Sequence, residues 1–389
     1  MIHKDKIMNY RFPEIRHISD VLPHVEGRDE FVVAEREGYT VVNYVVAMAD
    51  TFDMTGPDDL GGAIRRECRG LIFDRDGNLM SRPFHKFFNV NEREETQTHV
   101  VDMSQPHVIM EKMDGSMIRP IVVNGCLRLA TKMGVTSVAM DAETYLAGRS
   151  DAGEIMNWMA RCVKIGLTPI FEFVSPFNQI VLAYETADLV LLAIRHNETG
   201  NYLVEQNSTP SGLTRVPVYG SVAGNLGDYI ARQRGAEGRE GDIIRFADGH
   251  MLKVKNDWYV RIHKTVDRIV FDRNIVNLIL NEEVDDVVPM LPVIQANRVR
   301  NFEIRFAERL HATVEKYDRY WNTVVASGLD RKRYAQEWMP TIKHNDPFAA
   351  AYVFGRFGDR DGRAMILDHI EKHTTTNVRW DECAVWMGM

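Results

Sequence analysis

A lysine in a position suited to covalent chemistry is the first notable feature of this sequence. Lys112 ends the apolar run "VIMEK", and Asp114 and Gly115 follow it as a turn dipeptide. A lysine acts as a nucleophile only when its amine is neutral, a form that burial or neighbouring positive charge favours. A strand end beside a tight turn offers such a place, because glycine tolerates positive φ and close backbone approach. The stretch predicts a reactive Lys112 or, in the simpler interpretation, an exposed lysine beside an ordinary Asp-Gly turn.

A hairpin is expected to bring a second lysine to the same place. Asn-Gly dipeptides suit two-residue hairpin loops, in which positive φ is needed. If the Asn-Gly turn in "IRPIVVNGCLRLATK" closes such a loop, Lys132 lies opposite Met117. Lys132 would then lie near the turn that follows Lys112.

A later hairpin, "GDIIRFADGHMLKVK", carries two more lysines. A two-residue Asp-Gly loop would pair Lys255 with Asp242 and Lys253 with Ile244. Because side chains alternate along a strand, Glu240 would project from the same face as these four residues. Such a face is either a solvated surface or part of a binding site.

A glutamate interrupts an apolar strand in "PIFEFVSP". Glu172 would lie among buried neighbours, where a carboxylate must be paired, protonated, or bound to a cation or ligand. A nucleophilic lysine, further cations and two glutamates together suit phosphoryl chemistry. No G-x-x-x-x-G-K-[ST] loop occurs, so lysine side chains would have to hold the phosphates.

The elements that must position these residues differ between the two parts of the chain. Short β-rich runs separated by turn dipeptides extend from about residue 30 to 260. Among them, "TPIFEFV" and "ADLVLLAI" are expected to be central strands, and helical spacing is found at 137–148 and 153–166. This part predicts antiparallel sheets with flanking helices.

Helical spacing dominates after about residue 258. In 301–328 apolar residues recur every three or four positions, as in an amphipathic helix, and 267–282, 347–357 and 362–373 are similar. We therefore predict an α+β protein with a β-rich domain at 1–259 and an all-α domain at 260–389.

Composition sets further limits. The 389 residues are 45% hydrophobic and 26% charged, which predicts a globular protein of two domains. The four cysteines form no C-x-x-C pair, which argues against zinc and disulfides.

We find no signal-peptide core in the first twelve residues and no long apolar run, so we expect a soluble cytoplasmic protein without membrane contact. The net charge of −8 still allows a local basic groove.

The order of the motifs resembles the covalent nucleotidyltransferase superfamily of polynucleotide ligases and mRNA capping enzymes. "KMDG" at 112–115, "FEF" at 171–173, "EGDIIRF" at 240–246 and "LKVK" at 252–255 are similar to its motifs I, III, IV and V. Within it, "ECRGLIFD", "SRPFHKFFN", "RHNETGNY" and "LKVKNDWY" resemble the RNA ligase 1 family of T-even bacteriophages, over about residues 67 to 259. A DNA ligase would carry arginine where Met117 stands.

The resemblance implies an ATP-dependent RNA ligase with Lys112 as the catalytic residue. Lys112 would take up AMP and pass it to the 5′-phosphate of an RNA end, and a 3′-hydroxyl would then displace the AMP. Lys253 and Lys255 would bind phosphates, Glu240 and Glu172 would hold Mg²⁺, and Glu172 would also meet the ribose. Further residues implied to bind the nucleotide are Arg69, Lys86, Phe88, Glu111, Asp114, Gly115 and Lys132.

The resemblance also implies a substrate and leaves two alternatives. The expected partner is RNA, single-stranded or a broken tRNA loop, selected by the helical domain of a monomeric enzyme in the cytoplasm, that of the host if the protein is viral. One alternative is another superfamily member, a DNA ligase or capping enzyme. The other is a non-catalytic RNA-binding module on the same fold, which would lack a motif lysine, and none is missing.

Overall fold

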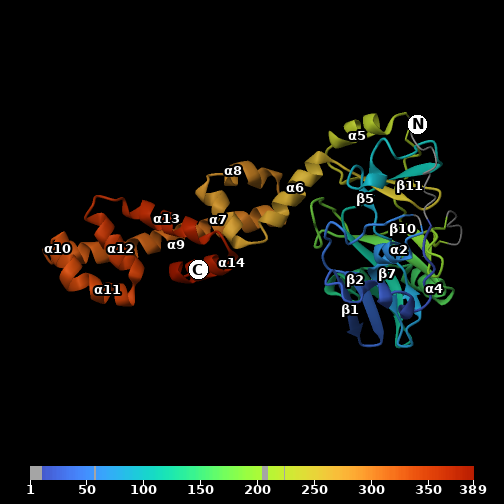
Figure 1. The fold of residues 1–389 in the computed structure, drawn as a ribbon, viewed down its shortest axis with the longest axis horizontal. Helices are drawn as coiled ribbons and strands as arrows, with labels where there is room; N and C mark the ends of the chain where they lie inside the picture. Colours follow the sequence, from blue (N-terminus) through green and yellow to red (C-terminus); the bar gives the residue numbers. More distant parts are fainter. Residues whose placement is uncertain (1–10, 57, 204–208, 223) are drawn as a thin grey trace. The chain divides into compact units, whose positions relative to one another are not determined.

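The computed structural model describes residues 11–56, 58–203, 209–222 and 224–389. The first ten residues, part of the stretch inspected for a signal peptide, lie outside the described residues. The chain divides into two compact units, Met1–Arg261 and Ile262–Met389, and the division falls within helix α6, Asp257–Arg268 (Figure 1). Across the described ranges, no helix is both long and apolar enough to span a lipid bilayer.

The first unit is built on β-sheets. Its described strands are β1 (Phe31–Arg36), β2 (Tyr39–Tyr44), β3 (Arg69–Phe73), β4 (Leu79–Ser81), β5 (Phe88–Asn89), β6 (His107–Glu111), β7 (Ser116–Val123), β8 (Cys126–Ala130), β9 (Leu167–Val174), β10 (Asp188–His196), β11 (Gly241–Phe246) and β12 (Met251–Lys255). They form three four-stranded sheets, ordered β1-β2-β3-β4, β10-β9-β7-β8 and β5-β12-β11-β6. Apart from the parallel pair β5 and β12, the described neighbours run antiparallel.

Helices accompany these sheets and make up the second unit. The first unit has the helices α1 (Leu22–Val25), α2 (Leu60–Glu67), α3 (Ser137–Ala147), α4 (Ala152–Lys164) and α5 (Leu226–Arg234), with 3₁₀ turns at Ile18–Asp20 and Glu94–Thr96. The second has α7 (Asp272–Leu280), α8 (Val284–Val287), α9 (Val293–Ala326), α10 (Arg331–Arg333), α11 (Met339–Asn345), α12 (Pro347–Arg356), α13 (Gly362–His373) and α14 (Asn377–Met387), with a 3₁₀ turn at Val288–Met290 and a π turn at Tyr334–Trp338. The predicted α+β class is confirmed.

The Asn-Gly hairpin is confirmed, but the predicted position of Lys132 in it is wrong. Asn124 and Gly125 both have positive φ, 51° and 79°, as a two-residue loop requires. Strand β8 ends at Ala130, however, and the chain then turns back, so the ladder stops before Lys132. Met117 instead pairs with Glu172 of β9.

The hairpin of β11 and β12 is confirmed with a register shifted by one residue. Lys253 pairs with Ile243 and Lys255 with Gly241, so neither lysine has its predicted partner. The loop holds three residues, because Phe246 bonds His250 across it, and Gly249 has φ of 92°.

The shift changes which side chains share a face. One residue of shift moves a strand's side chains to the opposite face. Asp242 and Ile244 are therefore buried on the face opposite Lys253 and Lys255, and the predicted single face of five residues is wrong.

Strand β9 is central in its sheet, as predicted, but β10 lies at the edge. The apolar run of β10 suggested a central strand, but most of its residues are buried although the strand lies at the edge of the sheet. Its outer backbone is covered: Leu191 N–H donates to Thr214 O at 2.8 Å, and Val216 N–H donates to Leu191 O at 3.0 Å. An edge strand covered in this way needs no charged residues to prevent aggregation.

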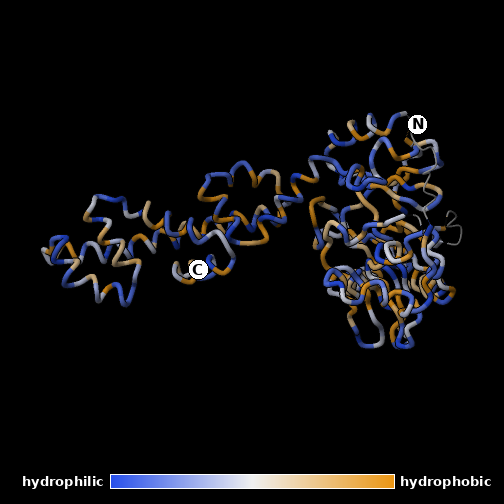
Figure 2. Tube along the Cα trace, in the orientation of Figure 1, coloured by the Kyte–Doolittle hydropathy of each residue, from blue (hydrophilic) through white to orange (hydrophobic). Residues whose placement is uncertain are grey.

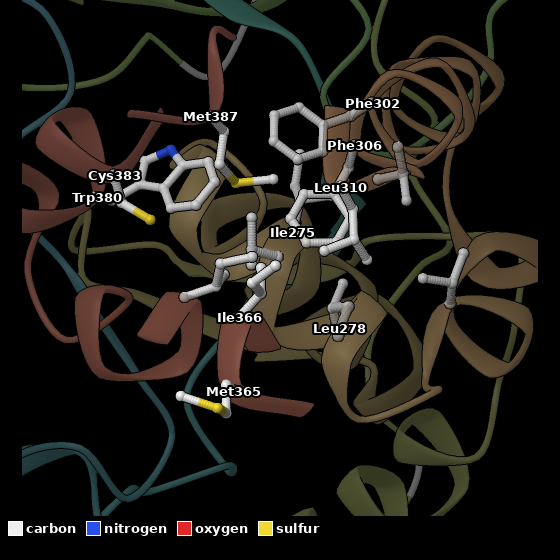
Figure 3. Close-up of a cluster of buried hydrophobic side chains, with 14 of the residues drawn as sticks. Ile275, Leu278, Phe302, Phe306, Leu310, Met365, Ile366, Trp380, Cys383 and Met387 are labelled. Atoms are coloured by element: carbon white, nitrogen blue, oxygen red, sulfur yellow. The ribbon is translucent and has the colours of Figure 1, made fainter. Parts of the chain in front are cut away.

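The second unit has its own core around α9. Phe302, Phe306 and Leu310 lie on one side of this helix and face Ile275 of α7 and Ile366 of α13 (Figure 3). In Figure 2 apolar and hydrophilic stretches alternate along these helices, as the three- and four-residue spacing predicted. The predicted helix at 267–282 is instead two, because α6 ends at Arg268 and α7 begins at Asp272.

Candidate active site

Lys112 and Lys255 meet at one buried carboxylate. Lys112 follows the last residue of β6, and its Nζ lies 2.7 Å from Oε1 of Glu240. Lys255 Nζ lies 3.2 Å from the same oxygen atom. The backbone N–H of Lys112 donates to Gly241 O at 2.9 Å. This bond holds the backbone of Lys112 next to that of Glu240. The structure thus brings together three of the predicted site residues, one just after β6, one at the end of β12 and one just before β11.

Glu172 faces this cluster from the neighbouring sheet. Burial, together with the negative charge of Glu240, raises the pKa of Glu172 to about 7, although Lys112 and Arg69 oppose the shift. The two predicted metal-binding carboxylates are therefore close enough to repel each other. A cation placed between them would remove that repulsion.

Removing the charge of Glu172 should stabilise the protein above neutral pH. The folded pKa of Glu172, about 7, exceeds the ordinary 4.5, so the cost of the buried charge grows as pH rises from about 4.5 and is complete above 7. We expect Glu172→Gln to raise the free energy of unfolding by about 1 to 3 kcal/mol at pH 8. Urea denaturation should find almost no difference at pH 4. Exposed Glu154→Gln is the control, and a less stable Glu172→Gln at pH 8 would contradict the expectation.

Lys253 lies beside the same cluster in a partly buried position. Its Nζ donates to Phe87 O at 2.9 Å and lies 4.6 Å from the centre of the Phe87 ring. Burial lowers the pKa of Lys253 well below its ordinary value, and the positive charges of Arg69, Lys86 and Lys112 lower it further. Lys253 therefore connects the Lys112 cluster with a second group of cations.

That second group surrounds Tyr44, which no sequence motif indicated. Lys86 Nζ lies 5.1 Å and Lys132 Nζ 5.6 Å from the centre of the Tyr44 ring. Burial alone would raise the pKa of Tyr44, but Arg69, Lys86 and Lys132 lower it below its ordinary value. Three of the predicted phosphate-binding cations thus gather at one phenol.

Lys132 reaches this group from a turn rather than from a strand. The turn passes close to Gly70, where a Cβ atom would lie 2.6 Å from the carbonyl oxygen of Lys132. Gly70 also has φ of 99°, so only glycine fits there without strain. The glycine of "ECRG" therefore allows Lys132 to approach Arg69.

Phe88 packs against three cationic side chains. It is buried, and its ring centre lies 5.1 Å from the Arg66 guanidinium, 4.9 Å from that of Arg93 and 5.5 Å from Lys86 Nζ. Cation–π contacts of this kind fix the direction of flexible side chains. Phe88 thus helps to hold the side chain of Lys86 in position.

Asp114 is more than a turn residue. Its side chain is buried and accepts hydrogen bonds from Val181 N at 2.9 Å, Leu182 N at 2.7 Å and Tyr259 Oη at 2.7 Å. Gly115 has no positive φ, but a Cβ there would lie 2.4 Å from Phe173 O, so the close approach predicted for it is present. The segment after Lys112 is therefore held in place by β9 and the loop that follows it.

Glu111 lies apart from the other candidates. Its carboxylate accepts a hydrogen bond from Tyr219, and it pairs across the sheet with Asp242, which binds Arg239 at 2.7 Å. The Arg239 guanidinium lies 4.8 Å from the Tyr219 ring centre. These contacts join the chain neighbours of Lys112 and Glu240, so Glu111 helps to fix both backbones.

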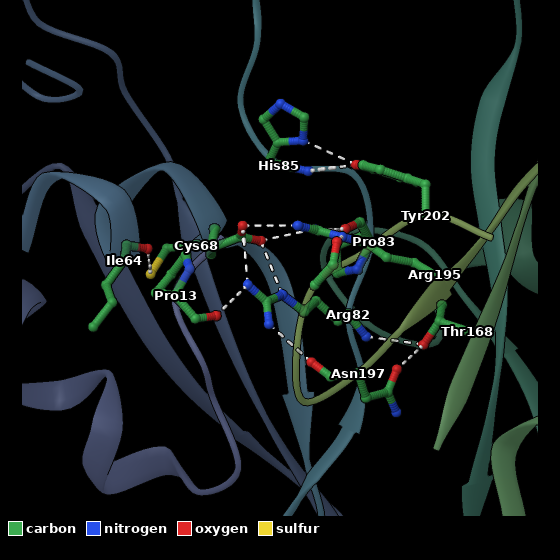
Figure 4. A network of polar contacts seen from close by, with 12 residues as sticks. Pro13, Ile64, Cys68, Arg82, Pro83, His85, Thr168, Arg195, Asn197 and Tyr202 are labelled. Carbon is green, nitrogen blue, oxygen red and sulfur yellow. Dashed lines mark hydrogen bonds and ion pairs between the residues drawn. The ribbon is translucent and has the colours of Figure 1, made fainter. Parts of the chain in front are cut away.

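A buried ion network lies close in the chain to Arg69, in β3, and to Lys86, in the segment between β4 and β5. The carboxylate of Glu67 lies 3.0 Å from Arg82 Nη2 and 2.7 Å from Arg195 Nη1, and all three side chains are buried. The arginines also donate to the carbonyl oxygens of Pro13, Pro83, Asn197, Glu198 and Gly200 (Figure 4). Burial alone would raise the pKa of Glu67, but Arg195 and Arg82 lower it to about 2.

Three antiparallel-rich sheets around an ion-paired lysine agree with the expected nucleotidyltransferase fold. The family model described as RNA ligase matches residues 67–214. A protein of Thermovibrio ammonificans named "Putative RNA ligase" is 30% identical over 297 residues, which cover 74% of this chain and 75% of the relative. This chain belongs to the RNA ligase family.

Two further relatives are less identical to this chain. RNA ligase 1 of bacteriophage TS2126 is 27% identical over 234 residues, 58% of this chain and 57% of the phage protein. A solved archaeal ATP-dependent RNA ligase superposes with a TM-score of 0.44 and 16% identity, over 76% of this chain and 79% of that one.

Proposed function

We propose that this protein is an ATP-dependent RNA ligase that joins a 5′-phosphate to a 3′-hydroxyl through a lysine-bound adenylate. The observation that carries the proposal is the position of Lys112, which shares Glu240 with Lys255 at 2.7 and 3.2 Å beside a ring of further cations. Membership of the RNA ligase family supports RNA as the substrate.

In the first step Lys112 Nζ attacks the α-phosphorus of ATP. The nitrogen loses a proton and forms an N–P bond, while the P–O bond to pyrophosphate breaks and its electron pair leaves with pyrophosphate. The Lys112–Glu240 ion pair must open first, because the amine nitrogen that contacts Glu240 has to reach the phosphorus. The phosphates of ATP would compete with Glu240 for both lysines, since they carry more negative charge.

Two further transfers complete the reaction. An oxygen of the RNA 5′-phosphate attacks the lysine-bound AMP, so the N–P bond breaks and an adenylated RNA end forms. The 3′-hydroxyl of the other end then attacks the 5′-phosphate and displaces AMP. Each step spreads negative charge over phosphate oxygens, so fixed cations stabilise each transition state.

The cations divide between two places. Lys253 and Lys255 lie near Lys112 and would hold the α-phosphate and the leaving pyrophosphate. Arg69, Lys86 and Lys132 gather at Tyr44 and would hold the outer phosphates or the incoming 5′-phosphate. Glu172 would bind the ribose, and Asp114, Gly115 and Phe88 would shape the site around the nucleotide.

Glu172 and Glu240 suit a magnesium ion. Carboxylate oxygens are the donors that Mg²⁺ prefers, and the repulsion that raises the pKa of Glu172 favours a cation beside both groups. Among the described residues, no group of three or more His, Cys, Asp or Glu side chains gathers, so phosphate oxygens and water would supply the remaining ligands. A bound Mg²⁺ would neutralise phosphate charge.

We propose further that residues 1–259 are the nucleotidyltransferase domain and that the helical residues 260–389 select the RNA. The substrate would be single-stranded RNA or a broken tRNA loop, and the enzyme would act as a monomer in the cytoplasm. The separate core of the second unit supports the domain division, and family resemblance supports the other assignments.

A labelling experiment tests this function. Incubated with Mg²⁺ and α-labelled nucleotide but no RNA, the wild type should become labelled by ATP and not by GTP. Lys112→Ala should reduce labelling at least a thousandfold, because no other amine takes its place. The matched control is the exposed Lys164→Ala, which should label like the wild type. Equal labelling of Lys112→Ala would remove Lys112 from the mechanism, and labelling by GTP would indicate a capping enzyme.

A further inference from the structure

One aromatic side chain beside the site lies almost wholly in water. Phe177 is 94% exposed, more than any other exposed large apolar side chain among the described residues; the next is Val385 at 76%. Single exposed apolar residues are common and need no explanation. Phe177 differs because hydrogen bonds hold its backbone in place and connect its loop to the segment that follows Lys112.

The loop that carries Phe177 is anchored on both sides of the ring. Phe177 N–H donates to Ser175 Oγ at 3.1 Å, and Asn178 N–H donates to Ser175 O at 3.2 Å. Asn178 Nδ2 donates to Ser116 Oγ at 2.9 Å. The phenyl ring is therefore presented from a closed turn whose next residue contacts the segment after Lys112.

The same loop is fixed a second time to this segment. Val181 and Leu182 both donate their N–H groups to Asp114, and Asp114 N–H donates to Tyr184 Oη at 3.2 Å. Residues after Phe177 thus contact the two positions, Asp114 and Ser116, that flank Gly115, and Phe173 before it pairs with Ser116 in the sheet. This attachment keeps the ring near the lysine, while its exposure keeps it outside the enclosed cluster of cations and carboxylates.

We propose that Phe177 stacks on a base of the single-stranded RNA end that is joined, an inference that rests on the proposed ligase function. Every nucleobase has an apolar face, so an exposed aromatic ring holds a single strand without regard to sequence. A base has to lie beside the lysine when AMP is transferred to the 5′-phosphate. Covering the ring would bury apolar surface that water now contacts. We assign RNA rather than the adenine of ATP as the partner, because Phe177 lies in water whereas Glu240, which contacts Lys112, is buried.

The test separates the adenylation step from RNA binding. In Phe177→Ala, labelling by α-labelled ATP without RNA should stay within twofold of the wild type. The KM for a single-stranded 5′-phosphorylated RNA in adenylate transfer should rise about tenfold or more. Phe177→Trp should keep the wild-type KM, and Phe177→Leu should lie between, because it keeps apolar area without a π-face. Ile165→Ala is the control, since Ile165 is an apolar side chain that is 66% exposed at the end of α4.

The outcomes distinguish this inference from the proposed function. Absence of labelling in the wild type would end the proposed function, whatever Phe177 does. A wild type that labels and joins RNA, with Phe177→Ala equal to it in KM for RNA, would overturn the stacking proposal alone. Loss of labelling in Phe177→Ala would also overturn it, because the ring would then contact ATP. A raised KM for RNA with unchanged labelling, restored by Trp, would support it.

Discussion

Glu67→Gln should cost about 3 to 5 kcal/mol of the free energy of unfolding. Glu67 is the shared carboxylate of two buried arginines, and its removal leaves Arg82 and Arg195 charged in the interior without a counter-ion. Glutamine keeps the shape, so the effect reports on charge rather than on packing. Urea denaturation at pH 7 measures it.

A surface ion pair of the same unit supplies the matched control. Glu198 contacts Arg16 with both side chains well exposed, so Glu198→Gln should change the free energy of unfolding far less than Glu67→Gln does. The contribution of Glu67 should be complete above pH 4.5 and fall as pH approaches its folded pKa of about 2. A Glu67→Gln variant as stable as Glu198→Gln would show that the network does not hold the strands together.

Lys253→Met should abolish most of the adenylation activity without destabilising the fold. Lys253 would face phosphate in the transition state, and removing one such fixed charge costs about a hundred- to a thousandfold in rate. In the free protein the same lysine is a partly buried cation near Arg69, Lys86 and Lys112, and desolvation lowers its pKa well below the ordinary value.

The stability of this variant has a definite sign. A lysine whose folded pKa is lowered costs stability at every pH below its unfolded pKa, so at pH 7 methionine should leave the protein as stable or more stable. Labelling rate and melting temperature measure the two effects, with Lys164→Met as control. A variant that loses stability and activity together would make Lys253 a structural residue.

The motif residues could be predicted because their chemistry restricts which residue types serve. Lys112, Glu240 and Lys255 belong to short motifs in a fixed order, and the structure joins all three at one oxygen atom. The hairpins and amphipathic helices were also predictable, since turn dipeptides and apolar spacing act locally.

Other features depend on contacts that the sequence does not encode locally. The register of β11 and β12 depends on the hydrogen bond between Phe246 and His250, which closes a three-residue loop. An Asp-Gly dipeptide does not determine whether the loop has two or three residues. Tyr44 gathers cations from three distant segments, and nothing in its own neighbourhood marks it. Glu67 likewise meets arginines that are far away in the sequence, and single buried charges are too rare to be expected from a pattern.

Locating the adenylate on the protein is the sharpest test of the proposed chemistry. After incubation with ATP and Mg²⁺ in the absence of RNA, the protein should be digested and its peptides weighed by mass spectrometry. The mass of AMP should appear on the peptide that contains Lys112, and fragmentation should assign it to that side chain. AMP on another residue, or a protein that joins RNA without any bound AMP, would contradict the covalent mechanism.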